Sequence, residues 1–276
     1  MLRSLYSGVS GMKSQQTRLD VISNNIANAN TIGFKSSRAN FSDILSQTTG
    51  NAADPRADVG GIDGKQVGLG VQVGAIDTDT SQGIQNTTGR ALDLYINGNG
   101  YLIFQRDASN AHVYSRNGAL KLDSQNYLTN SDGLRLMGIP ADGTNIAPLQ
   151  VPATMNGQAL VQGRVSIGPD GTVKARYGTE DQVVGQVQLA TFVNAAGLSK
   201  IGNSTYEAAA DSGQEVAVVP GDDGTNTLLA GTLEDSNVDL AQEFSDMIVT
   251  SRAYQANARS ISTSDEMLQE LVNLKR

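Results

Sequence analysis

Apolar residues recur at heptad spacing at both ends of the chain, whereas the middle lacks this pattern. Alternating steps of three and four residues give an N-terminal stripe of Leu2, Leu5, Val9, Met12, Gln16, Leu19, Ser23 and Ile26. The C-terminal stripe is Leu240, Phe244, Met247, Ser251, Tyr254, Ala258, Ile261, Asp265, Leu268 and Val272. A helix with such a stripe needs a partner helix. We therefore predict two terminal helices that pack together, with the intervening residues as an inserted domain.

The middle of the chain has the alternation of β-strands. From Val67 to about Ala230, β-branched and aromatic residues recur between turns, and Leu92, Leu94 and Ile96 alternate with polar neighbours. Asx-Gly dipeptides, which favour tight turns, recur from 63–64 to 223–224. The predicted fold class is α+β, with paired N- and C-terminal coiled-coil-like helices and an inserted all-β domain. The predicted parts are a helical core (1–30 with 237–276), a connecting arm and loop (31–75) and an all-β outer domain (76–236).

Local signals predict the ends of the helices. The first helix should end near Ile26, where side chains that hydrogen-bond their own backbone become dense. These residues, with the glycine that follows them, are Asn24, Asn25, Asn28, Asn30 and Gly33. The last helix should begin after Asp239, because Asp239 with Gln242 resembles a capping box. The segment 50–64 is expected to be a Gly-rich loop or hairpin.

Composition narrows the possible partners. The chain has 20 Lys plus Arg against 28 Asp plus Glu, and its net charge of −8 argues against nucleic acid as a partner. It contains no Cys, which excludes disulfides and thiolate metal sites. No run approaches the roughly 18 apolar residues of a membrane helix. The N-terminus lacks the apolar core of a signal peptide, so we expect export without a cleaved signal.

Candidate chemistry is sparse, and no catalytic, cofactor-binding or metal-binding residue is predicted. The single histidine, His112, lacks the partners of a nucleophile or zinc set, so we interpret it as a surface or turn residue. Asp77 and Asp79 lack the further oxygens of a calcium loop. The GNG segment at 98–100 is expected to be a turn rather than a phosphate-binding loop. A secreted carbohydrate-active β protein stays open as an alternative, because paired carboxylates are easily found among so many acids.

Long segments of the chain resemble one known family. The stretches SGVSGMKSQQTRLDVISNNIANANTIGFKSSRANFSDIL and NVDLAQEFSDMIVTSRAYQANARSISTSDEMLQELVNLKR resemble the terminal signatures of bacterial flagellar rod and hook proteins. The interior segments VGLGVQV, TTGRALDLYINGNGYLIF, VYSRNGALKLD and VQLATFVNAAGLSKIGNSTYE are similar to the β domain of the hook subunit. The resemblance runs nearly end to end.

This resemblance implies a structural protein rather than an enzyme. It implies a homopolymer in the extracellular flagellum, without cofactors, exported unfolded by the type III apparatus and contacting rod, hook-cap and hook–filament junction proteins. The segments VYSRNGALKLD, VGLGVQV and LVNLKR favour a short, Gram-positive-like hook protein, a flexible joint that transmits torque. The long stretch between Phe41 and Gly68 favours the alternative, the rigid distal rod.

Two sets of residues are predicted to matter in assembly. An assembly seam should supply cohesion, and it consists of Leu5, Val9, Met12, Leu19, Ile26, Phe244, Met247, Tyr254, Ile261 and Leu268. A compliance turn should let subunits move during bending, together with the loop at 50–64, and it consists of Asn24, Asn25, Asn28, Asn30 and Gly33.

Overall fold

The computed structural model describes residues 2–52, 54, 60–61, 63–106, 111–141, 143, 145–155, 157–221 and 226–274. These residues form two compact units, a helical unit (residues 1–27, 37–78 and 239–276) and a β unit (residues 28–36 and 79–238). The chain is therefore a mixed helix and sheet protein with a C-terminal helix and a large β domain. No described helix has the length and apolar character needed to cross a membrane.

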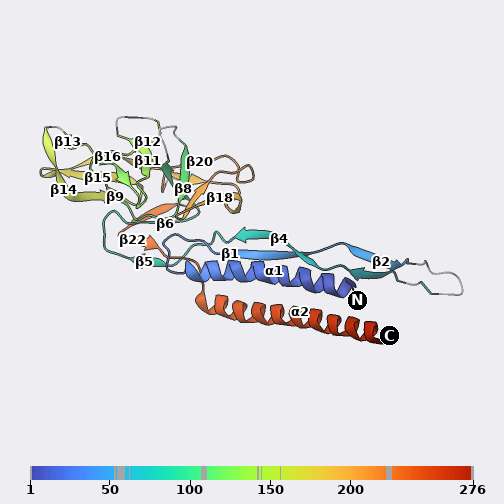
Figure 1. Ribbon diagram of the computed structural model, residues 1–276. Helices are drawn as coiled ribbons and strands as arrows, with labels where there is room; N and C mark the ends of the chain where they lie inside the picture. Colours follow the sequence, from blue (N-terminus) through green and yellow to red (C-terminus); the bar gives the residue numbers. More distant parts are fainter. Residues whose placement is uncertain are drawn as a thin grey trace. The chain divides into compact units, whose positions relative to one another are not determined.

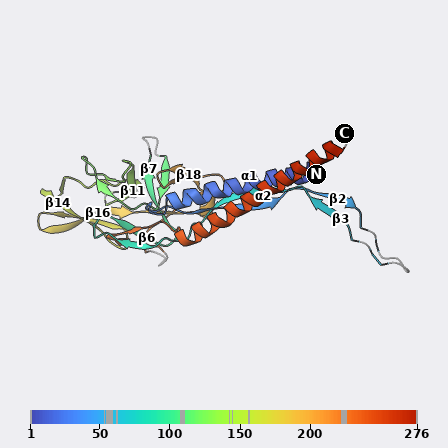
Figure 2. The same cartoon turned by 60° about the horizontal axis from the view of Figure 1, so that its bottom comes forward.

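The helical unit contains two long helices and two pairs of strands (Figure 1). Helix α1 spans Leu2–Ala27 and helix α2 spans Leu240–Leu274. The strands are β1 (Ser37–Asp43), β2 (Ser46–Gly50), β3 (Lys65–Gly68) and β4 (Val71–Thr78). Strands β1 and β4 pair antiparallel, as do β2 and β3. In Figure 1 and Figure 2, β2 and β3 continue the ribbon of β1 and β4 past the N-terminal end of α1.

The predicted ends of both helices agree with the structure. Helix α1 ends one residue after Ile26, and α2 begins immediately after Asp239. The Asp239 carboxylate caps α2 by accepting hydrogen bonds from the backbone N–H groups of Ala241 (2.9 Å) and Gln242 (3.3 Å). The capping box is not formed in full, because the Gln242 side chain donates to Asp246 instead (3.4 Å).

The β unit consists of short antiparallel strands. Its main sheet contains the path β13-β14-β15-β16-β11-β7-β8-β19-β18, and the smaller pairs β6–β21 and β5–β22 complete the unit. Its strands are β5 (Gln85–Thr87), β6 (Leu94–Asn97), β7 (Tyr101–Gln105), β8 (His112–Ser115), β9 (Lys121–Leu122), β10 (Leu128–Thr129), β11 (Arg135–Pro140), β12 (Ala147–Pro148), β13 (Thr154–Met155), β14 (Gln158–Ile167), β15 (Thr172–Tyr177), β16 (Glu180–Val187), β17 (Leu189–Thr191), β18 (Ser199–Gly202), β19 (Thr205–Glu207), β20 (Val216–Val218), β21 (Thr227–Ala230) and β22 (Thr232–Glu234).

The core of the β unit comes from the alternating segments. Leu94, Ile96, Leu102 and Phe104 are fully or almost fully buried in one cluster, and Tyr101 and Ile103 face a second cluster. Several Asx-Gly turns have the expected positive φ, including Gly98, Gly133 and Gly171. The predicted turns at 142–143, 156–157 and 223–224 include positions outside the described residues, as does much of the predicted loop at 50–64.

Candidate functional site

The face of α1 that meets α2 includes small and polar residues. A Cβ at Gly8 would lie 3.0 Å from Ile261 Cγ1, and one at Gly11 would lie 2.7 Å from Asn257 Nδ2. The glycines therefore let the two helices approach closely. The hydroxyls of Ser4 and Ser264 are 3.4 Å apart. Since early residues of α1 meet late residues of α2, the helices run antiparallel.

The other end of this helix pair is held by polar contacts. Arg18 Nη2 lies 3.3 Å from Asp246 Oδ1, and Asn25 Nδ2 donates to Glu243 Oε1 at 2.9 Å. Burial raises the pKa of the Glu243 carboxyl, and the hydrogen bond from Asn25 partly offsets this effect. Polar contacts therefore hold this end of the helix pair, in addition to the contact of Gly8 with Ile261.

A second face of α1 contacts the ribbon of β1 and β4. Ser10 Oγ accepts a hydrogen bond from the Val71 backbone N–H (3.4 Å), and Ser14 Oγ donates to the Val71 carbonyl (3.4 Å). Gly70 has a φ of +132°, and a Cβ there would collide with the Ser10 hydroxyl. Small residues on both sides thus bring the ribbon close to α1.

Seven of the ten predicted seam residues are half-buried, and three are exposed. On α1, Leu5, Met12, Leu19 and Ile26 are half-buried, and Val9 is exposed. On α2, Met247, Ile261 and Leu268 are half-buried, whereas Phe244 and Tyr254 are 51% and 37% exposed. Ile261 also lies against Gly8. A buried coiled-coil seam between these two stripes is therefore not confirmed, and the role of the ten residues stays a prediction.

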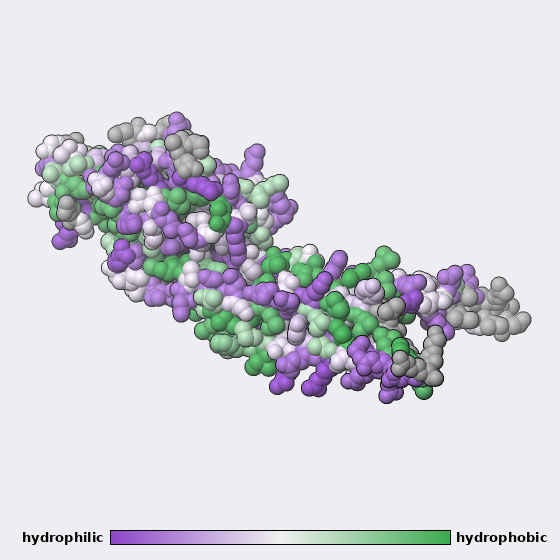
Figure 3. Space-filling view, viewed as in Figure 1, coloured by the Kyte–Doolittle hydropathy of each residue, from purple (hydrophilic) through white to green (hydrophobic). Residues whose placement is uncertain are grey.

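Much apolar surface on the terminal helices is open to solvent. Figure 3 shows hydrophobic side chains on the viewed face of the helical unit. The most exposed large apolar side chains on these helices are Tyr6, Ile248, Val249, Met267, Val272 and Leu274, each more than half exposed. Such surface is typical of an unoccupied protein interface.

The residues predicted to be compliant are held by hydrogen bonds. Asn25 is 1% exposed, and besides Glu243 its side chain bonds the backbone of Ser37 in both directions, at 2.8 and 3.0 Å. Asn28 Oδ1 accepts from the Thr31 hydroxyl at 3.1 Å. Asn24 and Asn30 are exposed. The role of these residues in compliance stays a prediction.

Gly33 is fixed within the β unit. Its φ is +66°, and its N–H donates to the Glu234 carbonyl at 2.8 Å. A Cβ at this position would lie 2.8 Å from backbone atoms of Arg116 and Asn117. Only glycine fits here without displacing the neighbouring backbone.

A buried charge cluster, absent from the sequence predictions, lies beside Gly33. Glu234 Oε1 lies 2.6 Å from Lys35 Nζ, and its Oε2 lies 3.3 Å from Arg116 Nη1. The side chains of all three residues are about 1% exposed. Burial lowers the pKa of Lys35, whose ammonium is stabilised by Glu234 and by the Ser81 carbonyl at 2.6 Å. The only sequence signal was that Lys35 and Arg116 lie in segments carrying the family resemblance.

The same cluster ties three distant segments together. Glu234 Oε1 accepts from the Gly83 N–H (2.8 Å), and Asn237 Nδ2 donates to the Asp79 carbonyl (3.0 Å). Asn237 Oδ1 accepts from the Ser36 N–H at 2.8 Å. Residues 33–36, 79–83 and 234–237 thus form one hydrogen-bonded junction within the β unit, called here the Glu234 junction.

The residues that the sequence offered as possible catalytic or metal-binding groups form ordinary polar contacts. His112 begins β8 and lies half-buried, with Nδ1 2.9 Å from Glu215 Oε1, and the Tyr114 hydroxyl also donates to Glu215. Asp77 accepts a hydrogen bond from Asn40. The GNG segment forms the turn between β6 and β7. Within the described part of the chain, no acidic or histidine cluster suits a metal ion.

Comparison with known proteins identifies the family. Residues 5–35 match the flagella basal body rod protein family, residues 95–175 match the flagellar hook protein FlgE/F/G D1 domain, and residues 229–274 match the flagellar basal body rod FlgEFG protein C-terminal family. The flagellar basal-body rod protein FlgG of Bacillus subtilis (strain 168) is 46% identical over 280 residues, covering 100% of both chains. The chain belongs to the flagellar rod and hook protein family.

Two further relatives bear on the choice within the flagellar rod and hook family. FlgG of Borreliella burgdorferi is 37% identical over 281 residues, and the flagellar hook protein FlgE of the same organism is 29% identical over 443 residues. Both alignments cover 100% of both chains. The comparisons thus favour the rod alternative over the hook function that the sequence segments suggested. These relatives are structural flagellar proteins, so the chain is an axial structural protein and not an enzyme.

Proposed function

We propose that the chain is the subunit of the distal flagellar rod, which polymerises into a rigid shaft. The observation that carries this proposal is the difference between the two Borreliella burgdorferi relatives. The alignment with the rod protein spans 281 residues, close to the 276 residues of this chain, whereas the hook protein has lower identity and an alignment of 443 residues. The long stretch between Phe41 and Gly68, with the ribbon of β2 and β3 in it, also supports the rod.

Rigidity has a physical basis in the polar contacts. Asn25 is held to Ser37 and Glu243, and the Glu234 junction binds three segments of the β unit through buried, charge-assisted hydrogen bonds. Moving such groups would leave buried polar atoms without partners, which costs about 1–3 kcal/mol for each. These contacts favour a stiff subunit over one whose turn at 24–33 bends during rotation.

Cohesion between subunits is assigned to the exposed apolar faces of the terminal helices. The contact between α1 and α2 inside one chain involves glycine, serine, asparagine and the seam residue Ile261, so the exposed apolar side chains, such as Phe244 and Tyr254, are available for coiled-coil-like packing with neighbouring copies. Full burial of one side chain such as Phe244 stabilises by about 1.5–3 kcal/mol. The ten seam residues would then lie mainly between subunits. We extend the proposal to type III export without a cleaved signal and to contacts with the adjoining rod and hook proteins.

Labelling of isolated hook–basal bodies tests the assignment. Gold-conjugated antibody against the β unit should mark the straight shaft below the hook in electron micrographs. Label along the curved external tube would instead establish the hook function. An antibody against an authentic hook subunit provides the matched control, because it marks the curved tube in the same particles.

A further inference from the structure

The chain passes between the helical unit and the β unit close to the Glu234 junction. The β unit comprises residues 28–36 and 79–238, so the chain enters or leaves it at 27/28, 36/37, 78/79 and 238/239. The last three of these positions lie next to the segments that the junction holds together, which are 33–36, 79–83 and 234–237. Tension that reaches the β unit along the backbone therefore arrives at the junction.

The first and the last of these segments run parallel. The Gly33 N–H donates to the Glu234 carbonyl at 2.8 Å, and the Ser36 N–H donates to Asn237 Oδ1 at 2.8 Å. Between these two contacts, Lys35 Nζ lies 2.6 Å from Glu234 Oε1. From the first contact to the last, both segments advance in the same direction along the chain.

This direction decides how a pull acts on the contacts. Helix α1 precedes residues 33–36 and helix α2 follows residues 234–237, so tension between the helices pulls opposite ends of the two segments. In parallel segments, such a pull slides one segment along the other and strains all of their contacts together. In antiparallel segments, the same pull would open the contacts one after another. Shared loading raises the barrier to forced unfolding, and this barrier sets the unfolding rate under tension.

The contacts are also anchored in the main sheet. Arg116, which directly follows β8, lies with Nη1 3.3 Å from Glu234 Oε2 and donates through Nη2 to the Gly98 carbonyl at 2.7 Å. Lys200 of β18 donates to the Lys35 carbonyl at 3.1 Å. Both β8 and β18 belong to the main sheet. A pull on the junction is therefore passed to the body of the β unit.

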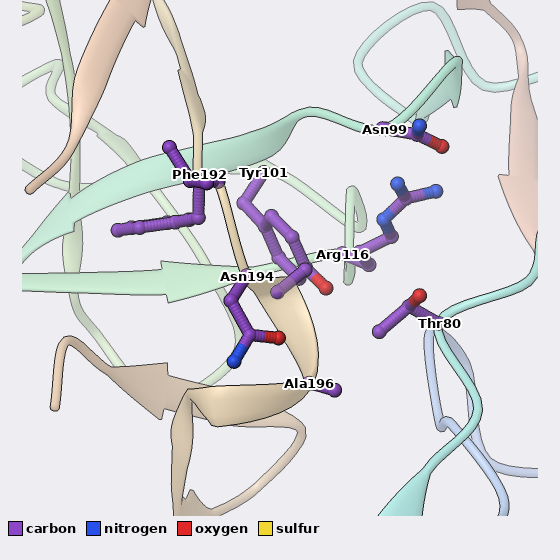
Figure 4. Close-up of a pocket in the computed structure, with 9 residues that line it drawn as sticks. Thr80, Asn99, Tyr101, Arg116, Phe192, Asn194 and Ala196 are labelled. Carbon is purple, nitrogen blue, oxygen red and sulfur yellow. The ribbon is translucent and has the colours of Figure 1, made fainter. Parts of the chain in front are cut away.

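Charged contacts rather than apolar packing hold the centre of the junction. The side chains of Lys35, Arg116 and Glu234 are about 1% exposed. A cavity of about 290 Å³ borders Arg116, and its lining includes Tyr101 and also Thr80 of the segment 79–83 (Figure 4). Charge-assisted hydrogen bonds are strong, and removing one partner of a buried pair leaves an uncompensated charge. The resistance of the junction should therefore depend on Glu234.

We propose that the Glu234 junction is a mechanical clamp, which keeps the β unit folded when tension between α1 and α2 reaches it along the chain. The proposal goes beyond the rod assignment, because it requires only an axial structural protein that bears load. Since the load acts first on the contacts between residues 33–36 and 234–237, the core of the β unit is still intact when the clamp breaks.

The first test pulls on single full-length chains at constant force. The chain contains no cysteine, so Asn30→Cys and Ala241→Cys, both at exposed positions, give specific attachment points on the two sides of the clamp. Unfolding of the β unit is the longest extension step, because it releases residues 79–238. Glu234→Gln should raise the rate of this step by about a hundredfold or more, since it leaves two buried cations uncompensated.

A core variant separates mechanical resistance from ordinary stability. Leu136→Ala removes a fully buried side chain from the main core and should lower stability against urea to a similar extent as Glu234→Gln. Contacts that are intact in the transition state do not affect the unfolding rate, so Leu136→Ala should leave the rate under tension nearly unchanged. Equal acceleration by the two variants would overturn the clamp.

The direction of the pull provides a second control. Attachment at Ser124→Cys and Ala208→Cys, two exposed positions of the β unit, applies tension that does not enter through residues 33–36 or 234–237. Glu234→Gln should then accelerate unfolding at least about tenfold less than it does with attachment on the two sides of the clamp. Equal acceleration in both pulling directions would show that Glu234 acts on stability alone, and would overturn the clamp.

A milder variant keeps the test decisive if the charge variant does not fold. Asn237→Ala removes hydrogen bonds to Ser36 and Asp79 without touching the buried charges, and it should raise the unfolding rate by about tenfold with tension across the clamp. Asn194→Ala is the matched control, because it removes hydrogen bonds to Asp211 elsewhere in the β unit and should leave the rate unchanged. The same rate in both variants would contradict the proposal.

These measurements are independent of the rod assignment. They are made on a single chain before any assembly, so they do not depend on where the polymer lies in the flagellum. Antibody label on the hook instead of the rod would refute the rod assignment alone. Equal acceleration by the junction and core variants, with correct rod labelling, would refute the clamp alone.

Discussion

Two features of the structure require glycine at position 33: a left-handed backbone and a lack of space for a Cβ atom. Its backbone is left-handed, and the space that a Cβ would need is occupied by the backbone of Arg116 and Asn117. Gly33→Ala should therefore lower the free energy of unfolding of the β unit by about 2–4 kcal/mol. Gly89→Ala is the matched control, because Gly89 has a φ of +72° with nothing within 4 Å of the added atom. It should cost only about 1–2 kcal/mol. Equal losses in urea denaturation would contradict the close packing at Gly33.

Glu234 is the centre of the buried charge cluster. Glu234→Gln would leave the Lys35 and Arg116 cations without a compensating charge, at a cost of about 3–5 kcal/mol in the free energy of unfolding. Asp181→Asn provides the control, because it removes an exposed partner of Arg176 and should leave unfolding unchanged within error. Denaturation of the two variants side by side is the measurement. Equally small effects of the two variants would contradict the role of Glu234 in compensating the buried cations.

Glu243 makes the stability of the helical unit depend on pH. Burial raises its pKa above the ordinary value of 4.5, so the folded chain holds this proton more tightly than the unfolded chain does. The contribution is fully present below 4.5 and is lost as the pH rises through the raised pKa. Glu243→Gln should flatten this part of the pH profile of helix melting followed by circular dichroism. Glu266→Gln, at an exposed position, should leave the profile as it is.

The cluster of asparagines between Asn24 and Asn30 can be recognised in the sequence, but the hydrogen-bond partners of these residues cannot. The same local pattern that predicts a turn is compatible with a mobile turn and with one fixed by Ser37 or Glu243. The partners of Asn25 and Lys35 lie up to 218 and 199 positions away. Because burial and such distant pairing depend on the whole fold, neither the Glu234 junction nor the cavity beside Arg116 could be predicted from local patterns.

At the scale of elements, the close contact between α1 and α2 depends on their glycines. Gly11→Val would place side-chain atoms where Asn257 lies and should force the helices apart. We expect the helical melting transition to lose about 2–3 kcal/mol in stability. Gln16→Val is the control for the lower helix propensity of valine, because Gln16 is exposed. A similar loss in both variants would contradict close packing at Gly11.

Periodicity predicted the helices themselves well, because their stripes and caps are local features. The faces were harder to predict. The heptad pattern of apolar residues predicts the contact between the two helices. On α1, however, Ser4, Gly8, Gly11, Arg18 and Asn25 contact α2, and of the predicted seam residues Ile261 lies against Gly8. In a polymer subunit, the strongest apolar stripe need not face the same chain. Sequence periodicity shows which residues share one face of a helix, but it does not show which surface covers that face.

At the scale of the whole molecule, we propose that the exposed apolar faces of α1 and α2 become buried between subunits of the rod. The β domain was predictable from alternation and turns, whereas rod and hook subunits share those patterns. Full-length comparison favours the rod because identity and alignment length differ between the rod and hook relatives.

The chain contains no cysteine, so a single introduced thiol reports on one position. Phe244→Cys places a thiol at a side chain that is 51% exposed in the single chain, and Thr250→Cys places one at a fully buried position. Maleimide labelling of Phe244→Cys should be fast in the dissolved chain and slow by about tenfold or more in assembled rods, as expected when access to a thiol is lost. Thr250→Cys should be slow in both. Equally fast labelling of Phe244→Cys in the dissolved chain and in assembled rods would contradict burial of this helix face between subunits.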